Sequence, residues 1–138
     1  MSGNRIHAVV AILQKSDTFL FVKRSGYTEA ASGYWCPVSG HIEEDETQED
    51  ALRREVIEEV GLEVVPVRKV CSIPSADDKF ILHFWSTEIV AGEARVCSHE
   101  ATELKWVTLK EMRRLEPVFE EDVQVLEALA ASQTQART

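Results

Sequence analysis

Three glutamates lie close together near the middle of the chain, at Glu55, Glu58 and Glu59. If residues 47–60 form a helix, side chains three and four positions apart share one face within a single turn. Like charges at this spacing repel one another, and a divalent cation would offset that repulsion. Mg²⁺ takes oxygen ligands and binds carboxylates together with substrate phosphates. The spacing therefore suggests phosphate chemistry, with a solvated helix face as the ordinary alternative.

A longer pattern surrounds these glutamates and is far more specific than they are alone. It consists of Gly40, five residues, Glu46, seven residues, and the run Arg54 to Leu62 with the sequence REVIEEVGL. The segment from Gly40 to Leu62 resembles the signature of the Nudix hydrolases at every fixed position. The resemblance implies a metal-dependent pyrophosphohydrolase that acts on a nucleoside diphosphate linked to another group.

The resemblance also implies roles for individual residues. Glu58 and Glu59 are expected to be the main ligands of Mg²⁺, for which Mn²⁺ could substitute. Glu55 is expected to be a third ligand or the general base, and in the family the backbone carbonyl of the glycine at position 40 also contributes. Bound metal ions can make a water nucleophilic and neutralise the charge that develops on phosphoryl oxygens.

Two further residues of the pattern are expected to support the catalytic glutamate. In the family the arginine, here Arg54, orients that glutamate, and Glu46 braces the loop against the helix. An ordinary surface ion pair is the alternative for Arg54. Glu55 is the first choice for the general base, with Glu46 or a residue of a later loop as alternatives. His99 titrates in a suitable range, although a lone loop histidine is more often merely solvated.

An additional metal ligand is expected from a later loop. In the family an acidic residue often reaches the metals about six residues before a tryptophan comparable to Trp106. Glu100 fits this spacing, and Glu103 is the nearby alternative. A solvated loop carboxylate is the competing interpretation of Glu100.

Aromatic residues are the candidates for binding a nucleobase by stacking, and packing in the core is the alternative for each of them. The candidates are Trp35, Tyr34, Phe84 and Trp85. Many family members carry Pro-Gly-Gly before the signature, whereas residues 37–40 of this chain read Pro-Val-Ser-Gly. This departure leaves the metal helix intact but puts in doubt a close transfer of the base-pocket geometry.

Composition is that of one ordinary globular domain. The chain has 138 residues, of which 44% are hydrophobic and 28% charged, and its formal net charge is −9. Such a charge argues against DNA binding, because nucleic-acid binding needs a basic face. No apolar run reaches the length of a membrane span and no signal peptide is evident, so we expect a cytoplasmic protein. The three cysteines fit neither paired disulfides nor zinc ligands and are expected to be buried thiols.

The order of strand and helix signals predicts an α/β (α+β) fold. β-rich runs predict strands at 7–13, 18–23, 62–73, 80–90 and 104–107, short extended pieces within 34–42, and a short strand after the turn at 91–93. Helices are expected at 47–60, in a short segment from 108 to about 117, and at 118–131. The Nudix resemblance implies an α/β/α sandwich with a mixed central sheet. We expect one domain over residues 1–132, a polar, disordered tail over residues 133–138, and a possible homodimer.

Several functions fit this pattern. The leading interpretation is Mg²⁺-dependent cleavage of a phosphoanhydride in a nucleotide sugar, a dinucleoside polyphosphate or an oxidised or ordinary nucleoside triphosphate. The alternatives within the fold are hydrolysis of an RNA end or an isoprenoid diphosphate. A module that binds a nucleotide without cleaving it is a further alternative, which the presence of all four glutamates of the pattern disfavours.

Overall fold

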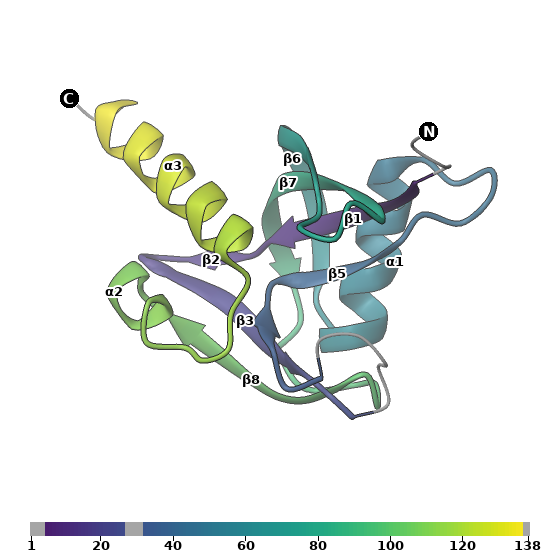
Figure 1. The fold of residues 1–138 in the computed structure, drawn as a ribbon, viewed down its shortest axis with the longest axis horizontal. Coiled ribbons are helices and arrows are strands. Elements are labelled where there is room, and N and C mark those ends of the chain that lie inside the picture. The colour runs from purple at the N-terminus through teal and green to yellow at the C-terminus, as the bar shows by residue number, and fades with distance from the viewer. Residues whose placement is uncertain (1–4, 27–31, 137–138) are drawn as a thin grey trace.

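The computed structural model describes residues 5–26 and 32–136. In chain order the elements are β1 (Ile6–Ile12), β2 (Gln14–Lys15), β3 (Thr18–Arg24), β4 (Trp35–Cys36), β5 (Val38–His41), α1 (Gln48–Val60), β6 (Glu63–Pro74), β7 (Phe80–Ala91), β8 (Ala101–Val107), α2 (Leu109–Met112) and α3 (Glu120–Ala136). Figure 1 shows α1 and α3 on opposite sides of the strands. None of the helices in the described ranges is both long enough and apolar enough to cross a membrane.

The strands form two sheets of four. In the first the order is β5-β1-β7-β6, with β1 and β7 parallel and the other neighbours antiparallel. The second contains β2, β3 and β4, with β8 also paired to β3, and its pairs are antiparallel. The predicted mixed sheet and α/β/α architecture are therefore confirmed, with the strands divided between two sheets.

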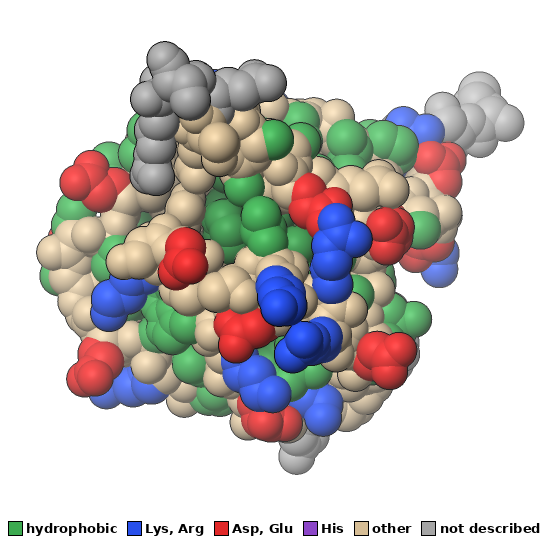
Figure 2. All heavy atoms as spheres, turned by 90° about the vertical axis from the view of Figure 1, so that its left-hand side faces the viewer, with side chains coloured by type: hydrophobic (Ala, Val, Ile, Leu, Met, Phe, Trp, Pro, Cys, Tyr) green, Lys and Arg blue, Asp and Glu red, His purple; other side chains and the backbone are tan. Residues whose placement is uncertain are grey.

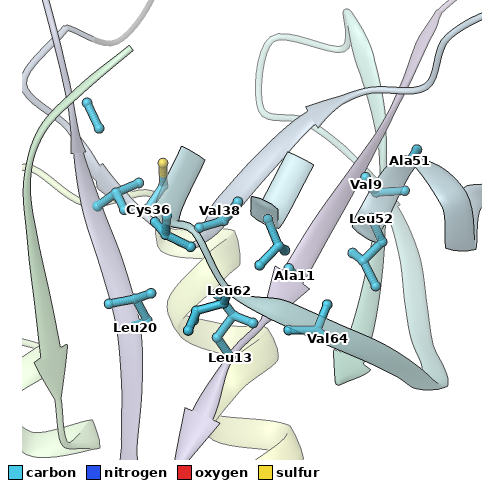
Figure 3. Close-up of a cluster of buried hydrophobic side chains, with 14 residues drawn as sticks. Val9, Ala11, Leu13, Leu20, Cys36, Val38, Ala51, Leu52, Leu62 and Val64 are labelled. Atoms are coloured by element: carbon cyan, nitrogen blue, oxygen red, sulfur yellow. The ribbon is translucent and has the colours of Figure 1, made fainter. Parts of the chain in front are cut away.

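Alternation along β1 sends its side chains to two separate cores, as expected for a strand covered on both faces. Val9 and Ala11 pack with Leu52 and Val56 of α1, and Figure 3 shows the first three of these side chains within that cluster. Val10 and Ile12 lie on the other face. They belong to the cluster that contains Phe84, Leu126 and Leu129. The first core fixes α1 against the sheet that carries Gly40.

Three expectations need correction, two about secondary structure and one about the burial of the cysteines. Helix α3 continues to Ala136, so the disordered tail is wrong for residues 133–136, while residues 137–138 lie outside the described ranges. Gln133 exchanges side-chain amide hydrogen bonds of 3.0 and 3.3 Å with Gln14, which ties the end of the helix to β2. The strand expected directly after residues 91–93 is absent from the described structure, where residues 92–97 are irregular and β8 begins at Ala101. Of the cysteines only Cys36 is buried, and Cys97 is exposed.

Charged side chains are mixed on the face that lies to the left in Figure 1. Figure 2 shows Lys and Arg side chains beside Asp and Glu side chains there, around a hollow lined by hydrophobic ones. One ion pair links Arg113, just after α2, to Glu127 of α3. The net charge of −9 therefore does not make this face uniformly acidic.

Candidate active site

Helix α1 carries the glutamates, and local signals define both of its ends. The hydroxyl of Thr47 accepts a hydrogen bond of 3.1 Å from the N–H of Asp50, which makes Thr47 the N-cap. Gly61 has φ = +73°, a conformation that glycine adopts without strain, and its N–H donates to the carbonyl of Ile57. The predicted start and end of the helix are confirmed.

Arg54 is the centre of an ion-pair cluster rather than a surface pair. Its Nε and Nη2 donate to the two carboxylate oxygens of Glu46 at 2.7 and 2.9 Å. Its Nη1 donates to Glu55 at 2.8 Å and lies 3.4 Å from Glu58. Nη2 also donates to the backbone carbonyl of His41 at 3.0 Å. One guanidinium thus joins the loop before α1, the end of β5 and two glutamates of the helix.

Glu46 is held firmly in this cluster. Besides the two bonds from Arg54, it accepts the N–H of Glu43 at 2.9 Å. These bonds, with Arg54 as the larger cause, lower the pKa of Glu46 to about 2. The structure therefore brings Arg54, Glu46 and Glu55 together as the resemblance implied, with Glu46 ionised at neutral pH.

Gly40 lies directly beneath the carboxylate of Glu55. A Cβ atom at position 40 would come within 2.0 Å of the Glu55 carboxyl carbon and 2.3 Å of both its oxygens. Gly40 itself is paired with Val9 in the sheet. A side chain at position 40 would therefore displace the Glu55 carboxylate from its place beside the Gly40 backbone, which the resemblance assigns to metal binding.

Glu59 is the unusual member of the set because its side chain faces inward. The residue is only 6% exposed, and its Oε2 has no hydrogen-bond partner. Burial raises the pKa of Glu59 well above its usual range, and the hydrogen bond and charge of Glu55 raise it further. An unpaired buried carboxylate oxygen next to a second carboxylate is costly unless a cation compensates for the charge.

The divalent cation implied by the sequence pattern fits these donors. Carboxylate oxygens and a backbone carbonyl are the ligands that Mg²⁺ prefers, and the buried oxygen of Glu59 lacks a partner. Within the described ranges, no three His, Cys, Asp or Glu side chains already surround a common point. Glu55 and Glu58 contact Arg54 instead. Glu55 already lies beside Glu59, whereas the exposed side chain of Glu58 would have to turn toward Glu59 to complete a site.

The later loop brings Glu100 toward the same place. The N–H of Cys97, three residues before Glu100, donates to the carbonyl of Glu59 at 2.9 Å, and the charge of Glu100 makes a small contribution to the raised pKa of Glu59. Glu103, in contrast, lies in β8 with its carboxylate 3.6 Å from the ammonium of Lys23. This arrangement favours Glu100 over Glu103 as the additional ligand.

The aromatic candidates divide into core and surface residues. Phe84 is 0% exposed and Trp35 is 5% exposed, both within the core beside α3. Neighbouring side chains cover both rings, which favours core packing over stacking on a base for these two residues. Tyr34 is half-buried and stacks on Phe119 with ring centroids 4.6 Å apart. Trp85 donates its Nε1–H to Gln48 at 2.9 Å, at the start of α1.

A second buried carboxyl group, which was not identified from the sequence, lies at the start of α3. Asp122 is 5% exposed, and burial, followed by the charge of Glu121, raises its pKa to about 8. Burial also raises the pKa of the Cys36 thiol to about 12, with the charge of Asp122 as the next cause. The positive charge of Arg24 acts on Asp122, Cys36 and Glu59 alike.

The spacing of Asp122 was the available signal. It precedes Leu126 and Leu129 by four and seven residues, and both leucines are buried. This spacing places Asp122 on the apolar stripe of the helix. The acidic run 120–122 also suits the positive end of a helix dipole, which is an ordinary role for exposed residues at this position.

His99 is a residue of the pocket that lies beside the end of β3. It lines a cavity of about 410 Å³ together with Ser25, Gly26, Ala101 and Thr102. This cavity lies beside Glu100 along the chain. A role for His99 as general base remains a prediction.

Comparison with known proteins agrees with this geometry. The family model for the NUDIX domain matches residues 3–129. The CTP pyrophosphohydrolase of Escherichia coli strain K12 is 29% identical over 126 residues, which cover 91% of this chain and 92% of that protein. The oxidized purine nucleoside triphosphate hydrolase of Mus musculus is 32% identical over 96 residues, or 67% of this chain and 60% of that protein.

A solved structure supports the same fold. The MutT protein of Methanosarcina mazei Go1 superposes with a TM-score of 0.81 at 23% identity, covering 94% of this chain and 95% of that one. The likeness extends over nearly the whole chain. With the family match over residues 3–129 and the arrangement of Gly40, Glu46, Arg54 and the glutamates of α1, the chain belongs to the Nudix hydrolase family.

Proposed function

We propose that this protein is a Mg²⁺-dependent pyrophosphohydrolase that cleaves a phosphoanhydride bond in a nucleoside diphosphate linked to another group. The observation that carries the proposal is the buried, unpaired Oε2 of Glu59 beside the carboxylate of Glu55. A bound divalent cation would compensate for both charges, and Mn²⁺ could replace Mg²⁺.

The residues of the cluster would have three roles, which are binding the cation, accepting a proton and positioning Glu55. Glu58, Glu59, Glu55 and the carbonyl of Gly40 would hold the cation, which supplies charge neutralisation at the phosphates and a water of lowered pKa. Glu55 is our first choice to accept the proton of the attacking water. Arg54 holds Glu55 in place through its 2.8 Å hydrogen bond.

Nucleoside triphosphates are the substrate class we favour, with a nucleoside monophosphate and diphosphate as products. The similarity to the CTP pyrophosphohydrolase covers about nine tenths of both chains, which supports this choice. The similarity to the oxidized purine nucleoside triphosphate hydrolase points to the same class. Tyr34, the half-buried candidate, would contact the base, although it already stacks on Phe119.

The test is a substrate panel with Mg²⁺ or Mn²⁺, with products separated by ion-exchange chromatography. The panel contains ordinary and oxidised nucleoside triphosphates, nucleotide sugars, ADP-ribose and dinucleoside polyphosphates. We expect release of diphosphate from a triphosphate, loss of turnover in excess chelator, and loss of turnover in Glu59→Gln. Glu49→Gln, on an exposed position of the same helix, is the matched control.

Other outcomes have distinct meanings. Binding of nucleotides without turnover would identify a regulatory module instead of an enzyme. Stepwise release of single phosphates would contradict cleavage at an internal phosphoanhydride.

A further inference from the structure

The irregular segment between β7 and β8 is fastened to the end of the glutamate helix. The N–H of Arg95 donates to the carbonyl of Val60 at 3.0 Å, and the N–H of Cys97 donates to the carbonyl of Glu59 at 2.9 Å. The last four carbonyls of a helix have no partner within the helix, so these bonds satisfy two of them. The segment is therefore attached to the residue that carries the buried carboxylate.

The end of this segment is held by two more hydrogen bonds. The N–H of Glu100 donates to the hydroxyl of Ser98 at 3.0 Å. The carbonyl of Glu100 accepts the N–H of Ser25 at 2.8 Å, and Ser25, just after β3, is 3% exposed. The backbone of Glu100 is thus fixed on both sides, between α1 and the end of β3.

Of these two hydrogen bonds to the Glu100 backbone, the bond to the Ser98 hydroxyl is the one that involves a side chain. Serine hydroxyls that accept a backbone N–H two residues ahead stabilise a local turn. Without this hydroxyl, the backbone N–H of Glu100 would bind water and the turn would gain alternative conformations. The position of the Glu100 side chain relative to Glu59, whose carbonyl accepts the N–H of Cys97, would then be less well fixed.

We propose that Ser98 is a positioning residue that holds the Glu100 carboxylate toward Glu59, so that the loop fixes one ligand of the cation site before any cation binds. The inference rests on the proposed function, because it assumes that Glu59 binds a divalent cation. It goes beyond that function by assigning the rigidity of the site to a loop outside the signature. Ser98 itself contacts neither cation nor substrate in this scheme.

The experiment measures Mn²⁺ binding without substrate, by EPR of the unbound ion. Ser98→Ala should weaken Mn²⁺ binding by about threefold to tenfold, the size expected for one hydrogen bond. Ser98→Thr keeps the hydroxyl and should restore binding. Ser75→Ala is the matched control, because the Ser75 hydroxyl also accepts a backbone N–H, that of Phe80 at 3.1 Å, in the turn between β6 and β7.

A double variant separates positioning from a general loss of structure. If Ser98 acts through Glu100, then Ser98→Ala should add nothing to the weakening caused by Glu100→Gln. Additive losses, or native affinity in Ser98→Ala, would overturn the inference while leaving the proposed function in place. A native protein that binds no Mn²⁺ would overturn both, and urea unfolding of each variant shows whether it is folded.

Discussion

The contact between Gly40 and Glu55 allows one substitution to disturb the site through a single methyl group. In Gly40→Ala the new Cβ would lie 2.0 Å from the Glu55 carboxyl carbon, whereas ordinary contact begins at 3.4 Å. Gly40 is not among the glycines with positive φ, so alanine fits its backbone conformation. The carboxylate is therefore the part that must move.

The expected effects on activity and on stability differ in size. The carboxylate must shift by more than about 1 Å, and a misplacement of this size at a catalytic centre costs about 100-fold in rate, or about 2.7 kcal/mol. The shift also breaks the 2.8 Å hydrogen bond from Arg54. Stability should change by less than about 1 kcal/mol, because the end of a flexible side chain can move and the repulsion between Glu55 and Glu59 is relieved.

The assay compares turnover with Mg²⁺ and the urea midpoint in native protein and variants. Gly26→Ala is the control, because its Cβ would meet only the Ser32 hydroxyl oxygen at 3.9 Å. In a Glu55→Ala background, Gly40→Ala should cost little further activity, since the colliding carboxylate is gone. Native turnover in Gly40→Ala, or an equal further loss in the Glu55→Ala background, would refute the reasoning.

Three further predictions concern charge. Glu59→Gln should abolish most activity yet raise the free energy of unfolding at pH 7, because it removes a carboxyl group that must take up a proton in order to be buried beside Glu55; a less stable variant in urea would contradict this. Glu100→Gln should lower the rate at least about tenfold, roughly 1.4 kcal/mol, while Glu103→Gln should do little, as steady-state rates would show. Burial, with lesser contributions from Lys69 and His7, lowers the pKa of His83 to about 4. Between about pH 6.5 and pH 4, His83 is therefore protonated in the unfolded chain but neutral in the folded chain, which favours unfolding. Stability should thus be complete above pH 6.5 and fall by about 3 kcal/mol toward pH 4, a fall that His83→Gln should reduce in urea titrations.

The glutamate helix could be predicted because its signals are local. The Thr47 cap, the Gly61 terminator and the apolar stripe lie within the helix or at its ends, so spacing alone indicates its limits. The same holds for the short helix expected from residue 108, where Thr108 and Glu111 form a capping box. Such features do not depend on what packs against the helix.

The sequence did not predict which of these side chains are buried in the folded protein. Glu58 and Glu59 are adjacent in the chain, yet Glu58 is exposed whereas Glu59 is buried, with an exposed fraction of 6%. Phe84 was a reasonable stacking candidate, but the parallel pairing of β7 with β1 places it opposite Val10 in the core. These outcomes depend on contacts between distant segments, which local periodicity does not specify.

The position of Arg54 explains why four acidic groups can share this part of the fold. It neutralises Glu46 through two hydrogen bonds and Glu55 through one, and it also lies near Glu58. A planar guanidinium can make these contacts at once, whereas a lysine ammonium offers no such fork. Glu59 accepts none of the hydrogen bonds from Arg54 and keeps an unpaired oxygen. Arg54 carries one positive charge, so it offsets only part of the negative charge of Glu46, Glu55 and Glu58, and a cation beside Glu59 would balance the remainder.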